Sequence, residues 1–331
     1  MCIFLGDSSD SLKNIASNSV NLVITSPPYD NLRNYESLTF EVFTTIANEL
    51  YRILVGGGVI VWVVGDSVIK GSETGSSFKQ VLYFKDIGFN IHDTMLYEKN
   101  TSSFPAKVSG NRYTQIFEYT FILSKGKPNT AHLICDKPNK WAGWVNWGRN
   151  SHRDKDDLLK INEEDIKPVP PFSPRNNIFK YSVGCGYGTK NKKVYEHPAS
   201  FPENLAIDHL LTWSEEQNTV LDPFMGSGTV GVACKRFNRK FIGIEISDVY
   251  FNLAKERIEL TEYKNETRES WVDQQKVISA ETDWKDLIKR VSTQKGLNLN
   301  IDNLTKEAIE ELHNEVEQFL TNKKFNPSVL E

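Results

Sequence analysis

The stretch Val220-Leu221-Asp222-Pro223-Phe224-Met225-Gly226-Ser227-Gly228-Thr229-Val230 decides the fold. Its apolar start predicts a strand over Thr219–Phe224, a glycine turn follows, and helical spacing runs over Gly228–Phe237. Glycines in such a turn let the backbone approach a ligand closely, and the start of a helix offers free N–H groups. The stretch therefore predicts a ligand-binding turn between a buried strand and a helix.

The glycine turn fits two cofactors. Gly226, Gly228 and Gly231 satisfy the pattern G-x-G-x-x-G, so an NAD-dependent dehydrogenase is one interpretation. The next predicted strand ends at Glu245, where a carboxylate can accept both hydroxyl hydrogens of a ribose in either cofactor. Asp222 favours S-adenosylmethionine, because a carboxylate at the strand tip repels a pyrophosphate but suits the cationic sulfonium and ammonium groups.

Predicted strands and helices alternate on both sides of this stretch. Apolar runs predict strands, and helical spacing predicts helices, in the chain order strand 2–5, helix 10–16, strand 20–25, helix 40–54, strand 59–64, helix 78–87, strands 91–98 and 117–123, helix 203–213, strand 219–224, helix 228–237, strand 240–246 and a helix ending near 263. Gly56-Gly57-Gly58 is expected to separate a helix from the β-branched strand Val59–Val64, which suits burial on both faces. The alternation predicts an α/β fold with a doubly wound, mostly parallel, Rossmann-like sheet.

An irregular segment rich in Pro, Gly, Asn and Lys interrupts this alternation. We therefore expect four parts: residues 1–125 and 196–262 as two halves of the sheet domain, 126–195 as an irregular insertion between them and 263–331 as a helical extension. The extension holds one amphipathic helix at Leu304–Leu320. From Lys99 to Lys193 there are 17 Lys and Arg against 8 Asp and Glu, an excess of nine positive charges in a chain of net charge −4. Such a regional excess suits a phosphate-facing surface, although a solvated loop region would also explain it.

Composition excludes several classes of protein. No stretch approaches the roughly 20 apolar residues of a membrane span, and the N-terminus lacks a basic-then-apolar signal, so we expect a cytoplasmic protein without a membrane partner. The four cysteines form no C-x-x-C pair, which argues against a disulfide framework and a zinc site. No metal site is predicted.

The segment Thr25-Ser26-Pro27-Pro28-Tyr29 follows the second predicted strand. Two successive prolines forbid helix and fix an extended turn, whose carbonyls can accept hydrogen bonds from the amino group of a base. Tyr29 can stack on a base that has left the duplex. An ordinary surface turn is the alternative, and the position at the end of a buried strand counts against it.

Taken together, the chain resembles the amino-methylating DNA methyltransferases of the circularly permuted β class, known from restriction-modification systems. The resemblance spans residues 6–258 and rests on segments in the expected order: Gly6–Ser8, Ser19–Thr25, Ser26–Tyr29, Tyr113–Tyr119, Leu123–Pro128, His197–Glu203, Asp222–Thr229 and Glu245. It implies S-adenosylmethionine as cofactor and double-stranded DNA as substrate. It also implies that residues 1–125 are the catalytic half, 126–195 the target-recognition insertion and 196–262 the cofactor half. It also allows for a cognate restriction endonuclease acting on the same site, and for a homodimer.

The resemblance assigns roles to the cofactor residues. Asp7 would bind the adenine amino group and Glu245 the ribose hydroxyls, although Asp7 also suits a helix N-cap. His197 and Pro198, with Phe201, would wall the methionine pocket; no second metal ligand lies at a usable spacing from His197. The methionine end would be held by Asp222, Pro223, Phe224, Gly226, Ser227, Gly228 and Thr229.

The proposed chemistry follows from the weak nucleophilicity of an exocyclic amine. Acceptors at Ser26 and the Pro27 carbonyl, held by Pro28, would bind both amino hydrogens and aim the nitrogen lone pair for direct in-line transfer. No cysteine lies near this turn, which disfavours methylation of a cytosine ring carbon. Within the family Ser26 leans toward cytosine N4, and adenine N6 stays the alternative. An RNA methyltransferase and the dehydrogenase are the more distant alternatives.

Overall fold

The computed structural model describes residues 1–28, 38–100, 110–144, 151–153, 155–161, 168–182, 201–263 and 266–279. These residues fall into two compact units, one of Met1–Ile134 with Arg175–Arg268 and the other of Cys135–Pro174 with the chain from Glu269 onward. We call them the sheet unit and the second unit. Tyr29, His197, Pro198 and the predicted helix Leu304–Leu320 lie outside the described residues.

The sheet unit is built on eight described strands, and it confirms the predicted α/β class. Across the sheet the strands are β1 (Cys2–Leu5), β14 (Lys240–Glu245), β13 (Thr219–Asp222), β2 (Val20–Thr25), β3 (Leu54–Val64), β7 (Phe117–Ser124), β6 (Asn90–Lys99) and β12 (Ile178–Tyr181). Within this sheet as described, β7 alone runs antiparallel to its neighbours. All other strands therefore end at the same edge.

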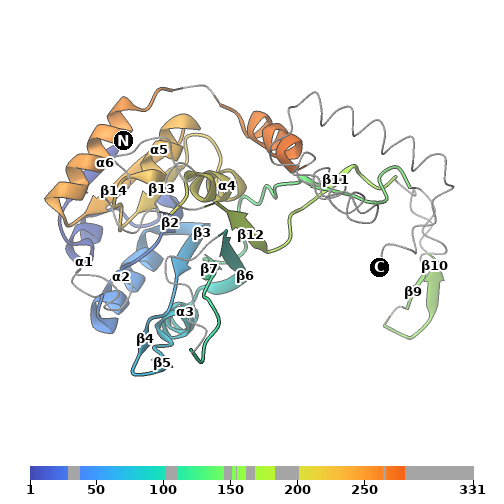
Figure 1. The fold of residues 1–331 in the computed structure, drawn as a ribbon, viewed down its shortest axis with the longest axis horizontal. Helices are drawn as coiled ribbons and strands as arrows, with labels where there is room; N and C mark the ends of the chain where they lie inside the picture. The colour runs from blue at the N-terminus through green and yellow to red at the C-terminus, as the bar shows by residue number, and fades with distance from the viewer. Residues whose placement is uncertain are drawn as a thin grey trace. The chain divides into compact units, whose positions relative to one another are not determined.

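Two groups of helices cover the sheet, on opposite sides in Figure 1. One group is α1 (Ser8–Ser11), the 3-10 turn η1 (Leu12–Asn14), α2 (Phe40–Ile53) and α3 (Ser76–Asp86). The other is α4 (Glu203–Trp213), α5 (Thr229–Arg236) and α6 (Asp248–Leu260). This is the doubly wound arrangement that the alternation of elements predicted.

An aromatic cluster fills the core between β3 and the helices α2 and α3. Trp62 of β3 meets Phe43 of α2 and Phe84 of α3 edge to face, with ring centroids 5.9 and 5.1 Å apart. All three side chains are fully buried, and the indole Nε1 of Trp62 donates to Gln80 Oε1 at 2.9 Å. Burial of three such rings with the one polar atom satisfied fixes both helices against the sheet.

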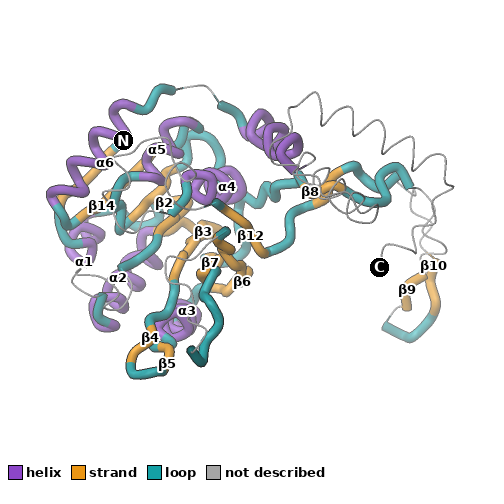
Figure 2. The backbone as a smooth tube through the Cα atoms, in the orientation of Figure 1, coloured by secondary structure: helices purple, strands orange, loops and turns teal. Residues whose placement is uncertain are grey.

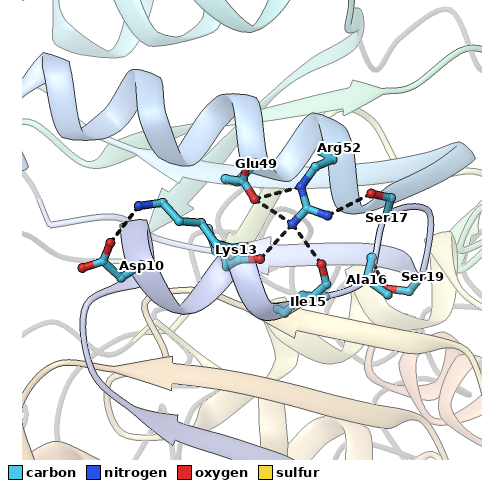
Figure 3. A network of polar contacts seen from close by, with 9 residues as sticks. Asp10, Lys13, Ile15, Ala16, Ser17, Ser19, Glu49 and Arg52 are labelled. Carbon is cyan, nitrogen blue, oxygen red and sulfur yellow. Dashed lines mark hydrogen bonds and ion pairs between the residues drawn. The ribbon is translucent and has the colours of Figure 1, made fainter.

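Arg52 of α2 fixes the segment that follows the first strand (Figure 3). Its guanidinium donates to the backbone oxygens of Leu12 and Ile15 at 3.0 and 2.9 Å, and to Ser17 Oγ at 2.9 Å. It also pairs with Glu49 Oε2 at 2.7 Å. One side chain thus binds the carbonyls of the first residue of η1 and of the residue that follows it, Leu12 and Ile15.

Three local predictions are wrong. The first helix begins at Ser8 rather than Asp10, because the Asp7 carboxylate accepts from the Ser9 amide at 2.6 Å and caps it there; η1 continues it only to Asn14. The glycines at 56–58 lie inside β3 rather than before it. Gly57 takes φ +78° and donates to the Lys125 carbonyl at 2.7 Å, so it serves as a bulge where another backbone segment approaches.

The third difference concerns β12 (Figure 2). Residues Ile178–Tyr181 fall in the range predicted to be irregular, yet they pair in parallel with Leu96–Lys99 of β6. Asp208 of α4 accepts from Tyr181 Oη at 2.7 Å and from Arg175 Nη1 at 2.5 Å, which holds this short strand in place. The four residues of β12 are held by contacts with residues far away in the sequence, so the local sequence contains no signal for a strand there.

The second unit has short paired strands, β8 (Lys137–Pro138) with β11 (Phe172–Ser173) and β9 (Ser151–Arg153) with β10 (Leu159–Ile161). A helix over 268–279 contributes buried Trp271 and Val272, and Lys276 Nζ lies 5.4 Å from the centroid of the Phe172 ring. The described start of the C-terminal extension, residues 268–279, therefore packs with the inserted segment. A hairpin of β4 (Val68–Ile69) and β5 (Ser72–Glu73) belongs to the sheet unit.

Candidate active site

The predicted site residues gather at the edge of the sheet where its parallel strands end. Leu5, the last residue of β1, pairs with Glu245, the last residue of the neighbouring strand β14. Asp7 comes two residues after Leu5, so it lies at the same edge as Glu245. Asp222 ends β13, the next strand, and Ser26 follows β2, the one after that. The carboxyl ends of parallel strands are where open α/β sheets bind ligands. Residues far apart in the chain, such as Asp7 and Asp222, are thus brought to one edge.

A buried hydrogen bond joins the end of β2 to the end of β13. Thr25 Oγ1 donates to Asp222 Oδ1 at 2.6 Å, and neither side chain is more than 2% exposed. The same Oδ1 accepts from the Phe224 amide at 3.1 Å. The turn that begins at Ser26 and the carboxylate of Asp222 are therefore held in one fixed relation. Thr25 stood in the predicted segment but was assigned no role, because its partner lies 197 residues away.

Asp222 is a carboxyl with an unusual proton affinity. Burial raises its pKa to about 7, against the opposing effect of the Thr25 and Phe224 hydrogen bonds. Among the described residues, no hydrogen bond reaches its second oxygen, Oδ2. A buried carboxylate with an open acceptor binds a cation, which would restore the ionised form. The residue fits the positive end of S-adenosylmethionine.

The glycine turn is held from both ends. Met225 N donates to the Ile244 carbonyl at 2.9 Å, and Gly226 N donates to Glu245 Oε2 at 2.7 Å. Gly226 and Gly228 have φ of +51° and +79°, in the left-handed region that favours glycine. Ser227 and Thr229 are buried, and the Ser227 carbonyl accepts from the buried Arg257 guanidinium of α6. The turn is thus preorganised by its own backbone.

Substitution of Gly228 should show how tightly this turn is packed. A Cβ there would lie 2.9 Å from Ala254 Cβ and 3.1 Å from its Cα, in addition to the strained φ. Gly126 is a matched control, because its φ of +83° is similar but nothing lies within 4 Å. We expect Gly126→Ala to cost about 1 kcal/mol and Gly228→Ala about 2–4 kcal/mol in urea unfolding. Equal losses in the two variants would contradict the close packing of the turn against α6.

Both carboxylate oxygens of Glu245 accept hydrogen bonds within the protein, and each can accept one more. Oε2 accepts from Gly226 N, and Oε1 accepts from Ser247 N at 3.0 Å. Burial raises its pKa, against the opposing effect of these backbone bonds. An ionised carboxylate has about four acceptor sites, so each oxygen can still accept one hydroxyl. This geometry suits a ribose diol.

Ile246, which sequence reasoning missed, directly follows Glu245. Its side chain is 61% exposed, although it stands at the tip of a buried strand. A large apolar side chain next to a diol-binding carboxylate offers a flat contact for the purine of a nucleoside. The signal in the sequence was an isoleucine one position beyond the predicted carboxylate.

Asp7 is exposed and caps α1 with one carboxylate oxygen, as one of its two predicted roles required. The hydroxyl of the buried Ser8 donates to the Pro223 carbonyl, so the Asp7 loop is tied to the turn after β13. Remaining lone pairs on Asp7 leave it able to accept from a ligand.

The other predicted residues are placed as far as the structure describes them. Pro27 is buried, and Ser26 and Pro28 are half-buried, at the end of β2. Phe201 is half-buried and precedes Pro202, the residue before α4. Within the described ranges, no group of three His, Cys, Asp or Glu side chains could hold a metal ion, and no helix is long and apolar enough to cross a membrane.

Comparison with known proteins identifies the family. A family model described as DNA methylase, named for N6 and N4 methyltransferases, matches residues 20–256. The chain belongs to this DNA methylase family. The orphan methyltransferase M.BamHII of Bacillus amyloliquefaciens is 50% identical over 246 residues, covering 74% of this chain and 91% of the relative. The Type II methyltransferase M.HpaI of Haemophilus parainfluenzae is 29% identical over 258 residues, covering 75% and 71%.

Solved structures share the fold of this DNA methylase. TTHA0409 of Thermus thermophilus matches with a TM-score of 0.53 and 25% identity, over 78% of this chain and 95% of that one. The cytosine-N4-specific PvuII DNA methyltransferase matches with a TM-score of 0.54 and 20% identity, over 83% and 90%, which shows the fold alone. The family match decides how the glycine turn is interpreted. The chain is a methyltransferase of the restriction-modification kind, S-adenosylmethionine is its cofactor and DNA its substrate.

Proposed function

We propose that this DNA methylase transfers a methyl group to the exocyclic amino nitrogen of a base flipped out of duplex DNA, and that the base is cytosine. The observation that carries the proposal is the buried bond between Thr25 Oγ1 and Asp222 Oδ1. It couples the carboxylate suited to the cationic end of the cofactor to the turn suited to a base amino group. Direct transfer requires two neighbouring sites held in a fixed relation, and this bond supports such an arrangement.

The cofactor residues follow from the charges and acceptors at the sheet edge. S-adenosylmethionine supplies an electrophilic methyl group when bound. Asp222 would hold its cationic end, with the backbone of the turn through Gly228 shaped around it. Glu245 would accept the ribose hydroxyls, Ile246 would contact the purine, and Asp7 would accept from the adenine amino group. Phe201, His197 and Pro198 stay proposed as the wall of the methionine pocket.

The chain's own part in the transfer is to orient the amine. Ser26 Oγ and the Pro27 carbonyl would each accept one amino hydrogen, which localises the nitrogen lone pair and directs it at the methyl carbon. The nitrogen gains the methyl group as the carbon–sulfur bond breaks, and it then releases one proton to solvent. Pro28 keeps the turn rigid, and Tyr29 would stack on the flipped base.

Cytosine is preferred because the turn begins with Ser26. The test is expression in cells that lack adenine and cytosine methylation, followed by mass spectrometry of nucleosides from their DNA and RNA. We expect N4-methylcytosine in DNA. N6-methyladenine would overturn the choice of base and leave amino methylation standing, and modified RNA with unmodified DNA would overturn the substrate.

We propose the second unit, rather than the whole predicted range 126–195, as the part that recognises the target. Its C-terminal helix gives a specific test, because Trp271 is 5% exposed while Val277 of the same helix is 58% exposed. We expect Trp271→Ala to lower affinity for target DNA at least about tenfold by loosening this unit, with cofactor affinity unchanged. Val277→Ala is the control. A Trp271→Ala protein with full DNA affinity would contradict the assignment.

A cognate nuclease is proposed on the relatives' names alone, and a homodimer on the family resemblance alone. M.HpaI is named a Type II methyltransferase, which favours a cognate restriction endonuclease, whereas M.BamHII is named an orphan methyltransferase. The nuclease proposal is tested by whether DNA modified by this protein becomes resistant to a nuclease encoded beside it. A homodimer is tested by light scattering of the purified protein with and without DNA.

A further inference from the structure

Two tryptophans are presented to solvent by a turn of the second unit. Trp141 and Trp144 are each 48% exposed, and their rings meet edge to face with centroids 5.8 Å apart. Indole rings bury a large area when they find a partner, so two together on a surface mark a binding site more often than an isolated apolar residue does. Neither ring is used in the proposed transfer.

The turn that carries the two rings is rigid. Gly143 N donates to the Val169 carbonyl at 2.9 Å, and Val169 N donates back to the Trp144 carbonyl at 3.0 Å. Asn139 adds two bonds to the Pro170-Pro171 segment, from its amide to Pro171 O at 2.9 Å and from Nδ2 to Pro170 O at 2.8 Å. The backbone is thus held at both ends, and the rings lose little conformational freedom on binding.

The stretch of sequence that contains the turn is basic. From Lys137 to Arg153 the sequence has four basic residues and no acidic one, whereas residues 154–174 have three basic and six acidic residues. Lys137 and Lys140 are exposed, and Asp136, just before this run, is 2% exposed. Positive charge interleaved with exposed aromatic rings suits a nucleic acid, whose phosphates bind the cations and whose bases stack on the rings.

We propose that Trp141 and Trp144 stack on bases that lose their stacking partners when the duplex is opened, and that Lys137 and Lys140 hold the adjoining phosphates. The proposal rests on the proposed function, because base flipping is what unstacks the neighbours of the target. It adds to the proposed stacking of Tyr29 a second set of aromatic contacts to DNA, carried by the second unit.

The test compares equilibrium binding to two mixed-sequence duplexes, one fully paired and one with a three-base mismatched bubble. The proteins are the unsubstituted chain, the double variants Trp141→Ala/Trp144→Ala and Trp141→Phe/Trp144→Phe, and Leu158→Ala, whose side chain is 63% exposed in the same unit. We expect the Ala pair to lose about tenfold in affinity for the bubble and less for the paired duplex. The Phe pair should stay within about threefold, since phenyl rings also stack. Leu158→Ala should bind normally.

The binding test of the stacking proposal can fail or succeed independently of any test of methyl transfer. Retained bubble binding by the Ala pair, or equal losses by the Ala and Phe pairs, would overturn the stacking proposal. Cofactor titration of each variant checks that the sheet unit is folded. Binding needs no catalysis, so an unsubstituted chain that prefers the bubble but transfers no methyl group would contradict the proposed function and leave the stacking site standing.

Discussion

Asp222→Asn is expected to weaken cofactor binding about 100-fold at pH 8. The reason is that the substitution removes the buried negative charge that would pair with the cationic end of the cofactor. Asparagine can keep the bonds to Thr25 Oγ1 and Phe224 N through its side-chain oxygen, so the turn should stay in place. Equilibrium titration with S-adenosylmethionine measures the loss. S-adenosylhomocysteine lacks the sulfonium charge but keeps the ammonium group, so it should lose less affinity than S-adenosylmethionine. Unchanged affinity for both ligands would contradict a charge-based role of Asp222.

The pKa of Asp222, about 7, sets the sign of the pH dependence. Above that pH the free protein holds a carboxylate ready for a cation, and below it a proton must leave first. Cofactor affinity of the unsubstituted protein should therefore fall about tenfold from pH 8 to pH 6, and that of Asp222→Asn should stay flat. A flat profile in both proteins would place the titrating group elsewhere.

The same substitution should stabilise the protein in the absence of cofactor. The folded pKa of Asp222 lies above the unfolded value near 4, so the folded state binds the extra proton between these limits. The protonated Asp222 of the folded state therefore contributes to the free energy of unfolding at low pH. This contribution is lost as the pH rises toward 7. Urea unfolding at pH 8 should show Asp222→Asn to be more stable by about 1–3 kcal/mol, and this difference should shrink at pH 5.

Ser26→Ala is expected to lower kcat about 100-fold, or ~2.7 kcal/mol in the transition state, by removing one of two acceptors for the base amino group. Its cofactor affinity should be unchanged, since Asp222 and the glycine turn are untouched. Ser19→Ala is the control, because Ser19 Oγ donates only to the Ala16 carbonyl at 2.6 Å, at the opposite end of β2. Single-turnover transfer separates this chemical step from product release. A variant that transfers at the normal rate would reduce the turn to a structural element.

Much of the sheet unit followed from sequence because its strands and helices are long and strongly patterned. Val59–Val64 is buried throughout, and the helix expected at 203–213 occupies those residues in the structure. Two of the three failures share one cause, which is that the deciding contact comes from far along the chain. The other, the start of α1 at Ser8, was set by the local cap at Asp7. Gly57 approaches Lys125 across 68 residues, and β12 depends on Asp208 of α4. Local propensity contains no trace of either partner.

The site residues also divide into those that the local sequence predicts and those that depend on contacts far along the chain. Asp222 and Glu245 could be predicted, because a carboxylate at the end of an apolar run marks the tip of a strand. Thr25 and Ser8 could not, since each acts through one hydroxyl whose acceptor, Asp222 or Pro223, lies about 200 residues away. The raised pKa of Asp222 likewise depends on burial, which the sequence does not state.

The central claim is that this protein methylates an amino nitrogen of a DNA base directly, through the turn at Ser26. The most direct measurement incubates the purified protein with methyl-labelled S-adenosylmethionine and mixed-sequence duplex DNA, and then identifies the labelled nucleoside after digestion. The account predicts label in N4-methylcytosine, and a rate that falls about 100-fold in Ser26→Ala. Label in 5-methylcytosine, or an undiminished rate in Ser26→Ala, would contradict it.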